Sequence, residues 1–308
     1  MPELPDVVVY IERLTALLAG RPLVRLQVFG PSLLQTYDPR PEAVAGRTVL
    51  GFRRIGKRIV WELEGGLFLV FHLMIAGRYH WKAGAAWPKT RPPKIVQALL
   101  QFDHGLMQLT EAGTKKRALL SIVSGEAALA EFDQGGLEVL SAELPAFAAA
   151  LRRENHTLKR SLTDPRLFSG IGNAYSDEIL HRARLSPLRL TGQMQDEEIV
   201  RLFDATRAAL SEWTDRLRRD TGDRFPEKVT AFRPEMAVHG RFGQPCPVCG
   251  SPVQRIAYAE NETNYCATCQ MDGRLLADRA WSRLLREDWP RTLDELEKRK
   301  RAIKDGPT

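Results

Sequence analysis

The four cysteines of the chain form two matched pairs near its carboxyl end. The pairs are Cys246-Pro247-Val248-Cys249 and Cys266-Ala267-Thr268-Cys269, with sixteen residues between them. Two such pairs on facing turns can supply four thiolates in the tetrahedral arrangement that zinc prefers. Four protein ligands leave no position for water, so we expect one structural Zn2+ ion and a β-hairpin between the pairs. Reduced cysteines without a metal are the competing interpretation.

The amino terminus offers a second reactive group. Proline follows Met1, and methionine at such a position is normally removed, which would give Pro2 a free secondary amine. An α-amino group has a pKa of ~7.7–8.0, so a useful fraction is an unprotonated nucleophile at neutral pH. Amines of this kind attack carbonyl-like carbon atoms, and the neighbouring Glu3 could transfer protons. Both residue types are common at these positions, so an ordinary amino terminus is the competing interpretation.

A third candidate is the turn Gly170-Ile171-Gly172-Asn173, which opens a predicted helix. Backbone N–H groups at a helix start suit a phosphate, and the Asn173 amide adds another donor. Simple N-capping by Asn173 is the alternative.

Charge and composition favour a polyanionic partner. The chain has 45 Lys and Arg against 38 Asp and Glu, a net charge of +7. This surplus indicates nucleic acid, although charge alone does not separate DNA from RNA or an acidic membrane. No apolar run approaches the ~20 residues of a membrane span, and neither a cationic leader nor a disulfide framework is visible. We therefore expect a cytoplasmic monomer without membrane contact.

The elements that must position these groups change character along the chain. Apolar residues recur with a helical period over residues 1–20, and short β-type runs follow from 23 to about 123. The Ala/Gly/Pro-rich stretch Lys82–Pro93 is predicted to be a loop, and the chain beyond 130 to be helical, most clearly at 195–218. We expect domains at residues 1–130, 131–240, 241–275 and 276–308.

In this order, the Pro2-Glu3 terminus, the β domain, the Gly-Ile-Gly-Asn turn and the cysteine finger resemble the formamidopyrimidine-DNA glycosylase/endonuclease VIII family. The resemblance spans residues 1 to about 270. It implies an α+β multidomain fold with an N-terminal helix plus β-sandwich and a C-terminal helical helix-two-turn-helix domain that carries a zinc-finger β-hairpin. DNA would lie in the cleft between the two halves.

The resemblance also assigns roles to single residues. Pro2 matches the family's nucleophile, Glu3 its proton-transfer acid, and Lys57 its catalytic-site lysine, which contacts the phosphate beside the lesion. Lys159 and Asn173 match DNA-binding residues, Asn173 as the phosphate clamp.

Three features of the first domain depart from the family's pattern. Asp6 stands where a glutamate is usual. Ile75 takes the place of the methionine wedge that follows His-Leu-Gly, and either inserts into DNA or faces the core. Thr110–Arg117 lacks the Arg and Phe that fill the gap left by a flipped base.

The finger departs from the pattern as well. Asn261 aligns with the usual DNA-contacting arginine, so the phosphate grip there must be weaker or come from Arg255 or Arg274. Asn261 and Arg274 are nevertheless our candidate DNA-binding residues in the finger.

The resemblance implies a bifunctional DNA glycosylase/AP lyase of base excision repair, active on damaged DNA in duplex, bubble or single-stranded form. The target nucleotide is extruded, the Pro2 amine forms a Schiff base at C1′, and β(,δ)-elimination cuts the strand. No redox cofactor is required, and the site of action would be the nucleoid. A non-catalytic protein that binds lesions or abasic sites is the first alternative, and a zinc-ribbon RNA- or ribosome-associated module is the second.

Overall fold

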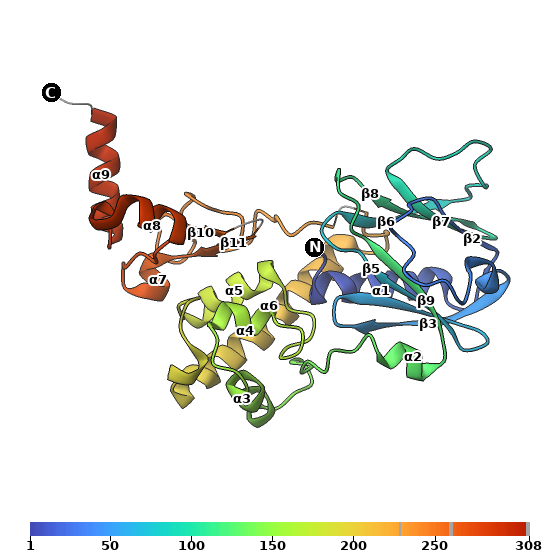
Figure 1. Ribbon diagram of the computed structural model, residues 1–308, viewed down its shortest axis with the longest axis horizontal. Coiled ribbons are helices and arrows are strands. Elements are labelled where there is room, and N and C mark those ends of the chain that lie inside the picture. The colour runs from blue at the N-terminus through green and yellow to red at the C-terminus, as the bar shows by residue number, and fades with distance from the viewer. Residues whose placement is uncertain (228, 259–260, 306–308) are drawn as a thin grey trace. The chain divides into compact units, whose positions relative to one another are not determined.

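The computed structural model describes residues 1–227, 229–258 and 261–305, which form two compact units (Figure 1). Unit 1 consists of Met1–Gly136 and Ser211–Ala231, and unit 2 of Leu137–Leu210 and Phe232–Thr308. Helix α6 (Asp196–Thr221) therefore begins in unit 2 and ends in unit 1. The predicted domain borders near residues 130, 240 and 275 remain a prediction.

Unit 1 contains helix α1 (Leu4–Leu18) and two antiparallel sheets of strand order β1-β3-β4-β5-β9 and β2-β7-β8-β6. The strands are β1 (Pro22–Leu23), β2 (Arg25–Val28), β3 (Arg47–Ile55), β4 (Arg58–Leu63), β5 (Leu67–His72), β6 (Gly77–Ala83), β7 (Val96–Phe102), β8 (Gly105–Glu111) and β9 (Leu119–Ser124). A short 3-10 turn, η1 (Pro41–Val44), and helix α2 (Glu126–Ala130) complete the unit.

Aromatic side chains join the two sheets face to face. Tyr79 of β6 lies with its ring centroid 6.0 Å from that of Trp61 on β4 and 5.4 Å from that of Phe71 on β5. All three side chains are buried in one apolar cluster. Tyr79 also meets Tyr10 of α1, with 5.7 Å between ring centroids, so the helix closes the same core. The predicted N-terminal helix and β-sandwich are confirmed.

The predicted turn between β4 and β5 illustrates how sequence sets the strand pairing. Gly65 and Gly66 have φ angles of 83° and 69°, a left-handed geometry that glycine adopts without strain. Two such residues in succession are typical of tight antiparallel hairpins. The turn fixes the register in which Leu63 pairs with Leu67.

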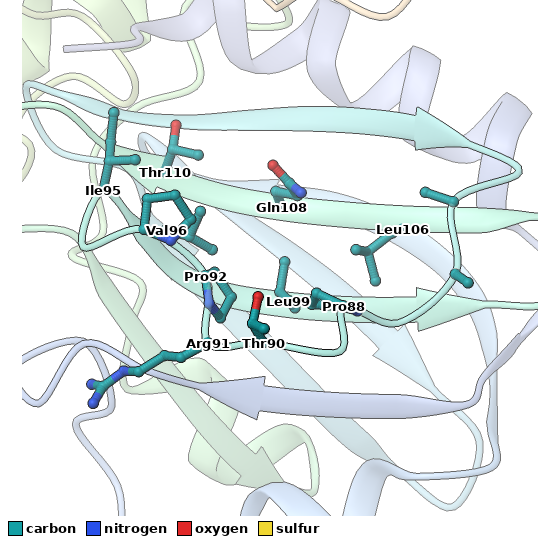
Figure 2. A pocket seen from close by; sticks show the side chains of 13 residues that line it. Pro88, Thr90, Arg91, Pro92, Ile95, Val96, Leu99, Leu106, Gln108 and Thr110 are labelled. Atoms are coloured by element: carbon teal, nitrogen blue, oxygen red, sulfur yellow. The ribbon is translucent and has the colours of Figure 1, made fainter.

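The segment between β6 and β7 covers the second sheet on the side away from this core. Leu99 and Leu106 face that side and pack against Trp87 of the segment, and the Arg25 guanidinium lies 4.0 Å from the Trp87 ring centroid. A shallow pocket of about 480 Å³ lies under the segment (Figure 2). Arg91 is the one charged residue among the described residues that line it, so the pocket offers no acid–base pair for catalysis.

Unit 2 is helical and carries a two-stranded finger. Its helices are α3 (Leu144–Arg152), α4 (Leu158–Thr163), α5 (Asn173–Ala183), η2 (Thr191–Gln193), the first part of α6, α7 (Ala267–Met271), α8 (Arg279–Leu285), η3 (Arg286–Asp288) and α9 (Leu293–Asp305). Strands β10 (Gln254–Tyr258) and β11 (Asn261–Tyr265) pair antiparallel, which confirms the predicted hairpin between the cysteine pairs. Among the helices of the described residues, none has the length and apolar character that a membrane span needs.

Candidate active site and zinc finger

The amino-terminal site is built on the first turn of α1. Glu3 is the N-cap residue and Pro5 occupies the first turn, where a missing N–H costs nothing. The Asp6 carboxylate accepts a hydrogen bond of 3.0 Å from the backbone N–H of Glu3. Pro2, Glu3 and Asp6 are all buried. The shorter carboxylate at position 6 thus serves as a helix cap that fixes the backbone beside the candidate nucleophile.

The charges around the terminal amine favour its neutral form. Burial lowers the pKa of the amino group of Met1, and the cations of Arg78 and Lys57 lower it further. The carboxylates of Glu3 and Asp6 act in the opposite direction, Glu3 more strongly. A neutral amine is the nucleophilic form, and these four side chains are close enough to tune it.

Lys57 is presented by the turn between β3 and β4, where Gly56 adopts a φ of 60°. Burial lowers the pKa of the Lys57 ammonium, the Glu3 carboxylate raises it, and Arg58 lowers it again. The structure therefore brings Lys57 together with Glu3 and the terminal amine, as the sequence prediction requires.

His72 joins this group, although sequence reasoning gave it no role. Burial, followed by the positive charges of Arg58, Lys57 and the terminal amine, lowers the pKa of His72 to about 4. The imidazole is therefore neutral at pH 7 and offers an N–H donor beside the cations. Its only sequence signal is its place at the end of β5, shortly before the candidate wedge.

The candidate wedge lies at the tip of the turn between β5 and β6. The Gly77 N–H donates to the Leu73 carbonyl at 2.9 Å, and a Cβ on Gly77 would lie 2.3 Å from the same oxygen. Met74 takes a φ of 51°, and Ile75 is 55 % exposed. Ile75 is thus a solvent-facing apolar residue on a tight turn and not part of the core.

Arg78 ties this turn to a distant part of unit 1. Its guanidinium donates to the carbonyls of Ile75 at 3.0 Å and Gly77 at 2.6 Å, and to that of Val229 at 2.5 Å. The same cation acts on the terminal amine. Arg78 is a second residue near the site that the sequence analysis did not identify.

The segment after β8 is closed upon itself. The buried Glu111 carboxylate accepts hydrogen bonds from the backbone N–H groups of Arg117, at 2.9 Å, and Ala118, at 3.2 Å. The Lys116 ammonium donates to the Glu111 carbonyl. The segment holds cations but no aromatic ring, in agreement with its sequence.

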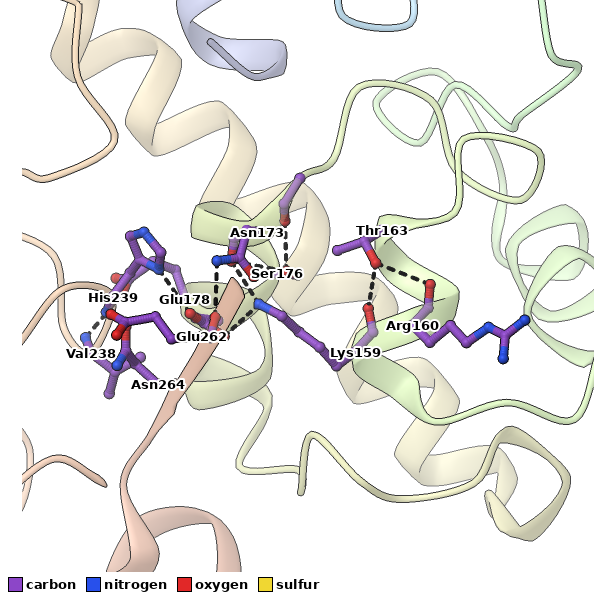
Figure 3. A network of polar contacts seen from close by, with 12 residues as sticks. Lys159, Arg160, Thr163, Asn173, Ser176, Glu178, Val238, His239, Glu262 and Asn264 are labelled. Atoms are coloured by element: carbon purple, nitrogen blue, oxygen red, sulfur yellow. Dashed lines mark hydrogen bonds and ion pairs between the residues drawn. The ribbon is translucent and has the colours of Figure 1, made fainter. Parts of the chain in front are cut away.

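In unit 2, Asn173 is the first residue of α5, and Gly172 is the N-cap (Figure 3). The Asn173 side-chain amide therefore does not cap its own helix, and it donates to the Glu262 carbonyl of β11 at 2.9 Å. The Lys159 ammonium is buried, 2.7 Å from the Asn173 carbonyl and 2.6 Å from Asp177 Oδ1. Lys159 thus holds the first turn of α5 in this structure.

The two acids of α5 hold the segment that leads into the finger. Asp177 Oδ2 lies 2.8 Å from His239 Nδ1, and the Glu178 carboxylate accepts from the N–H groups of Ala237, Val238 and His239 at 2.8 to 3.0 Å. Burial raises the pKa of Glu178, while these backbone donors lower it. Helix α5 and the finger therefore share one buried polar network.

The four cysteines converge as the spacing predicts. The Sγ atoms of Cys246 and Cys269 are 3.9 Å apart, and those of Cys249 and Cys266 are 3.4 Å apart. Tetrahedral zinc with Zn–S bonds of about 2.3 Å sets its sulfur atoms about 3.8 Å apart. The donor set fits one structural Zn2+ ion, which confirms the predicted cofactor.

The finger's candidate DNA-binding residues differ in what the structure gives for them. Asn261 begins β11, and its side chain lies outside the described residues. Arg274 is exposed just after α7, whereas Arg255 stacks on Phe242 with 4.4 Å between guanidinium and ring centroid, and lies 3.6 Å from Glu262. Arg274 is therefore the more available cation of the two.

Family models match three consecutive parts of the chain. These are the formamidopyrimidine-DNA glycosylase N-terminal domain at residues 1–117, the H2TH domain of the same enzymes at 136–217, and the zinc finger found in FPG and IleRS at 243–270.

Similar proteins extend over nearly the same range. A formamidopyrimidine-DNA glycosylase of Thermus thermophilus is 34 % identical over 89 % of this chain and 100 % of its own length. One of Herpetosiphon aurantiacus is 32 % identical over 88 % and 100 %. The crystal structure of the MutM (Fpg) protein of Thermus thermophilus superposes with a TM-score of 0.72 at 31 % identity, covering 87 % of this chain and 98 % of that one. Each of these similarities leaves out about a tenth of this chain.

Proposed function

The chain belongs to the formamidopyrimidine-DNA glycosylase family, DNA glycosylases of base excision repair with AP lyase activity, and we propose that its own chemistry is carried by the Pro2 amine with Glu3 and Lys57. The observation that supports this assignment is the buried terminal amine, whose pKa is lowered among Glu3, Arg78 and Lys57. A protein that only binds DNA has no need of a neutral amine beside a carboxyl group.

In the proposed reaction, the neutral Pro2 amine attacks C1′ of the damaged nucleotide. The Glu3 carboxyl group donates a proton to the sugar ring oxygen as the ring opens, and the base departs with its bonding electrons and a proton. The resulting iminium ion draws electrons from C2′, which loses a proton while the bond from C3′ to the 3′ phosphate breaks. A second elimination would release the 5′ phosphate. Lys57 neutralises the phosphate beside the lesion.

The decisive test is borohydride trapping on DNA that contains an abasic site, because reduction fixes a covalent adduct only where an amine has formed an imine. We expect one adduct per active chain, none with Pro2→Gly, and none in a chain that keeps Met1. Lys57→Met is the matched control, since it removes a cation near the amine but leaves the nucleophile. Equal trapping by Pro2→Gly would assign the chemistry to a lysine.

We further propose how the chain holds DNA. Solved relatives include a Lactococcus lactis Fpg in complex with DNA containing an abasic site, which covers 87 % of this chain at 23 % identity with a TM-score of 0.75 and supports the fold. Asn173 and Arg274 contact phosphates, Asn261 assists in the finger, and Ile75 enters the base stack. Lys159 acts indirectly, by holding the helix that carries Asn173. The chain works as a monomer at the nucleoid of the cytoplasm.

A further inference from the structure

A histidine from the helical part of unit 2 lies at the zinc finger. His181 is in the last turns of α5, and its Nε2 atom is 3.3 Å from the Sγ atom of Cys246, which is 65 residues further along the chain. The ligand atoms of His181, Cys246, Cys266 and Cys269 all lie within 4.8 Å of one another. The Cys249 Sγ atom is 3.4 Å from that of Cys266. Five donor atoms therefore converge where a tetrahedral ion takes four.

The fold holds His181 in place from several directions. The side chain is 5 % exposed, and the finger is bonded to α5 and the residues after it. The Gln270 amide of α7 donates to the Leu185 carbonyl at 2.8 Å, and the Asn173 amide at the other end of α5 donates to the Glu262 carbonyl. The imidazole is thus positioned by a helix and does not depend on the finger's own loops.

The five donors are not equally protected. Cys246 and Cys266 are buried and Cys269 is partly buried, whereas Cys249 is exposed. A neutral imidazole can do two things beside a zinc thiolate: its N–H can donate to the sulfur, or its lone pair can bind the metal. Three cysteines with one histidine is an ordinary ligand set for structural zinc.

We propose that His181 is a reserve ligand of the finger. With four cysteines bound, its Nε2–H donates to the Cys246 thiolate. When the Cys249 thiolate is lost, the His181 nitrogen takes the fourth position and the finger keeps its metal as a Cys3His site. This property concerns the metal alone and is independent of the glycosylase chemistry.

The first test measures the zinc content and zinc affinity of the full chain against a competing chelator. We expect Cys249→Ser to retain one zinc ion per chain, and Cys249→Ser with His181→Gln to lose it. His181→Gln alone should keep the metal with an affinity lower by about 10- to 100-fold, the usual effect of removing an outer hydrogen-bond partner. Cys266→Ser is the matched cysteine control, and we expect it to weaken binding more than Cys249→Ser does.

The second test observes the ligand directly. In cadmium-loaded Cys249→Ser, a correlation between the 113Cd nucleus and the imidazole protons should appear, and it should be absent in the wild type. This spectrum needs no change at His181, so it decides the question even if His181→Gln fails to fold. His181→Phe, which keeps a ring of similar shape, tests whether packing alone matters. The proposal is overturned if Cys249→Ser shows no such correlation, or if it releases metal as readily as the double variant.

Discussion

The Nζ atom of Lys159 lies 2.6 Å from Oδ1 of Asp177, and both side chains are buried. The other carboxylate oxygen of Asp177 faces His239, so a cation of α4, an acid of α5 and a ring of the finger approach share one network. Removing one member would leave an unpaired charge away from water, which is costly. Family resemblance suggests a DNA contact for Lys159, but the structure gives this ammonium a load within the protein.

Lys159→Met should therefore lower the free energy of unfolding by about 3–5 kcal/mol, as expected for breaking a buried ion pair. Urea denaturation of the free protein measures this change. The double variant Lys159→Met with Asp177→Leu is the control, because it removes both charges and should recover part of the loss. If Lys159 instead contacts a phosphate directly, stability would change little, and the slope of log binding constant against log salt would fall by about 1.

Arg78 should set the acidic limit of the reaction. Its cation lowers the pKa of the terminal amine, whereas Asp6 raises it. Below its pKa the amine is protonated and cannot attack, so Arg78→Met should move the acid limb of the trapping rate to higher pH. Asp6→Asn should move it to lower pH, and Arg78→Lys should leave it near that of the wild type. The measurement is the initial rate of borohydride trapping across the acid limb and the neutral range. Coincident limbs for Arg78→Met and Asp6→Asn would contradict this electrostatic account.

These residues show which features sequence can and cannot reveal. The cysteine finger is predictable because its ligands lie in two short segments whose spacing is itself the signal. The β4–β5 turn is predictable because Gly65 and Gly66 meet a local backbone requirement. Arg78 and His181 carry no such signal, since each reaches its partner only after strands or helices distant in sequence have packed together.

The helix start at Asn173 is an intermediate case. The sequence identified the turn, but the competing roles of N-cap and phosphate donor depend on one residue of register. The structure makes Gly172 the cap and leaves the Asn173 amide facing β11. Likewise, the burial of Lys159 depends on how α4 packs on α5, which its spacing from Asn173 does not encode.

His72 should make the stability of the protein depend on pH. Its pKa of about 4 lies below the ~6.5 of an exposed imidazole, so the unfolded chain binds more protons between these values. The stabilisation is complete above about pH 6.5 and is lost as the pH falls toward 4, by on the order of 2 kcal/mol. His72→Gln cannot titrate and should flatten this part of the curve. Urea denaturation at several pH values measures the difference, and an NMR titration of His72 with a midpoint near the ordinary imidazole value of ~6.5 would contradict it.

The closed segment after β8 and the exposed wedge together predict the preferred lesion. Flipping a well-paired base costs a few kcal/mol, and the cost is least where pairing is already damaged or absent. An enzyme for a well-stacked lesion needs side chains that fill the hole and hold the orphaned partner. Here the Glu111 carboxylate holds Arg117 and Ala118 in a turn without an aromatic ring. Ile75, at 55 % exposure, is the apolar side chain available at the neighbouring turn.

We therefore expect 8-oxoguanine opposite cytosine in duplex DNA to be a poor substrate, compared with abasic sites, oxidised pyrimidines or ring-opened products. Single-turnover excision of each lesion, in duplex and single-stranded oligonucleotides of one sequence, makes the comparison. Ile75→Ala should slow excision from the duplex by roughly 10-fold, which corresponds to about 1.4 kcal/mol of lost stacking support, and should leave single-stranded excision nearly unchanged. Ile75→Met is the matched control and should restore duplex excision. A clear preference for 8-oxoguanine opposite cytosine in the wild type would mean that another segment fills the hole, and equal losses on both DNA forms would show that Ile75 does not act as a wedge.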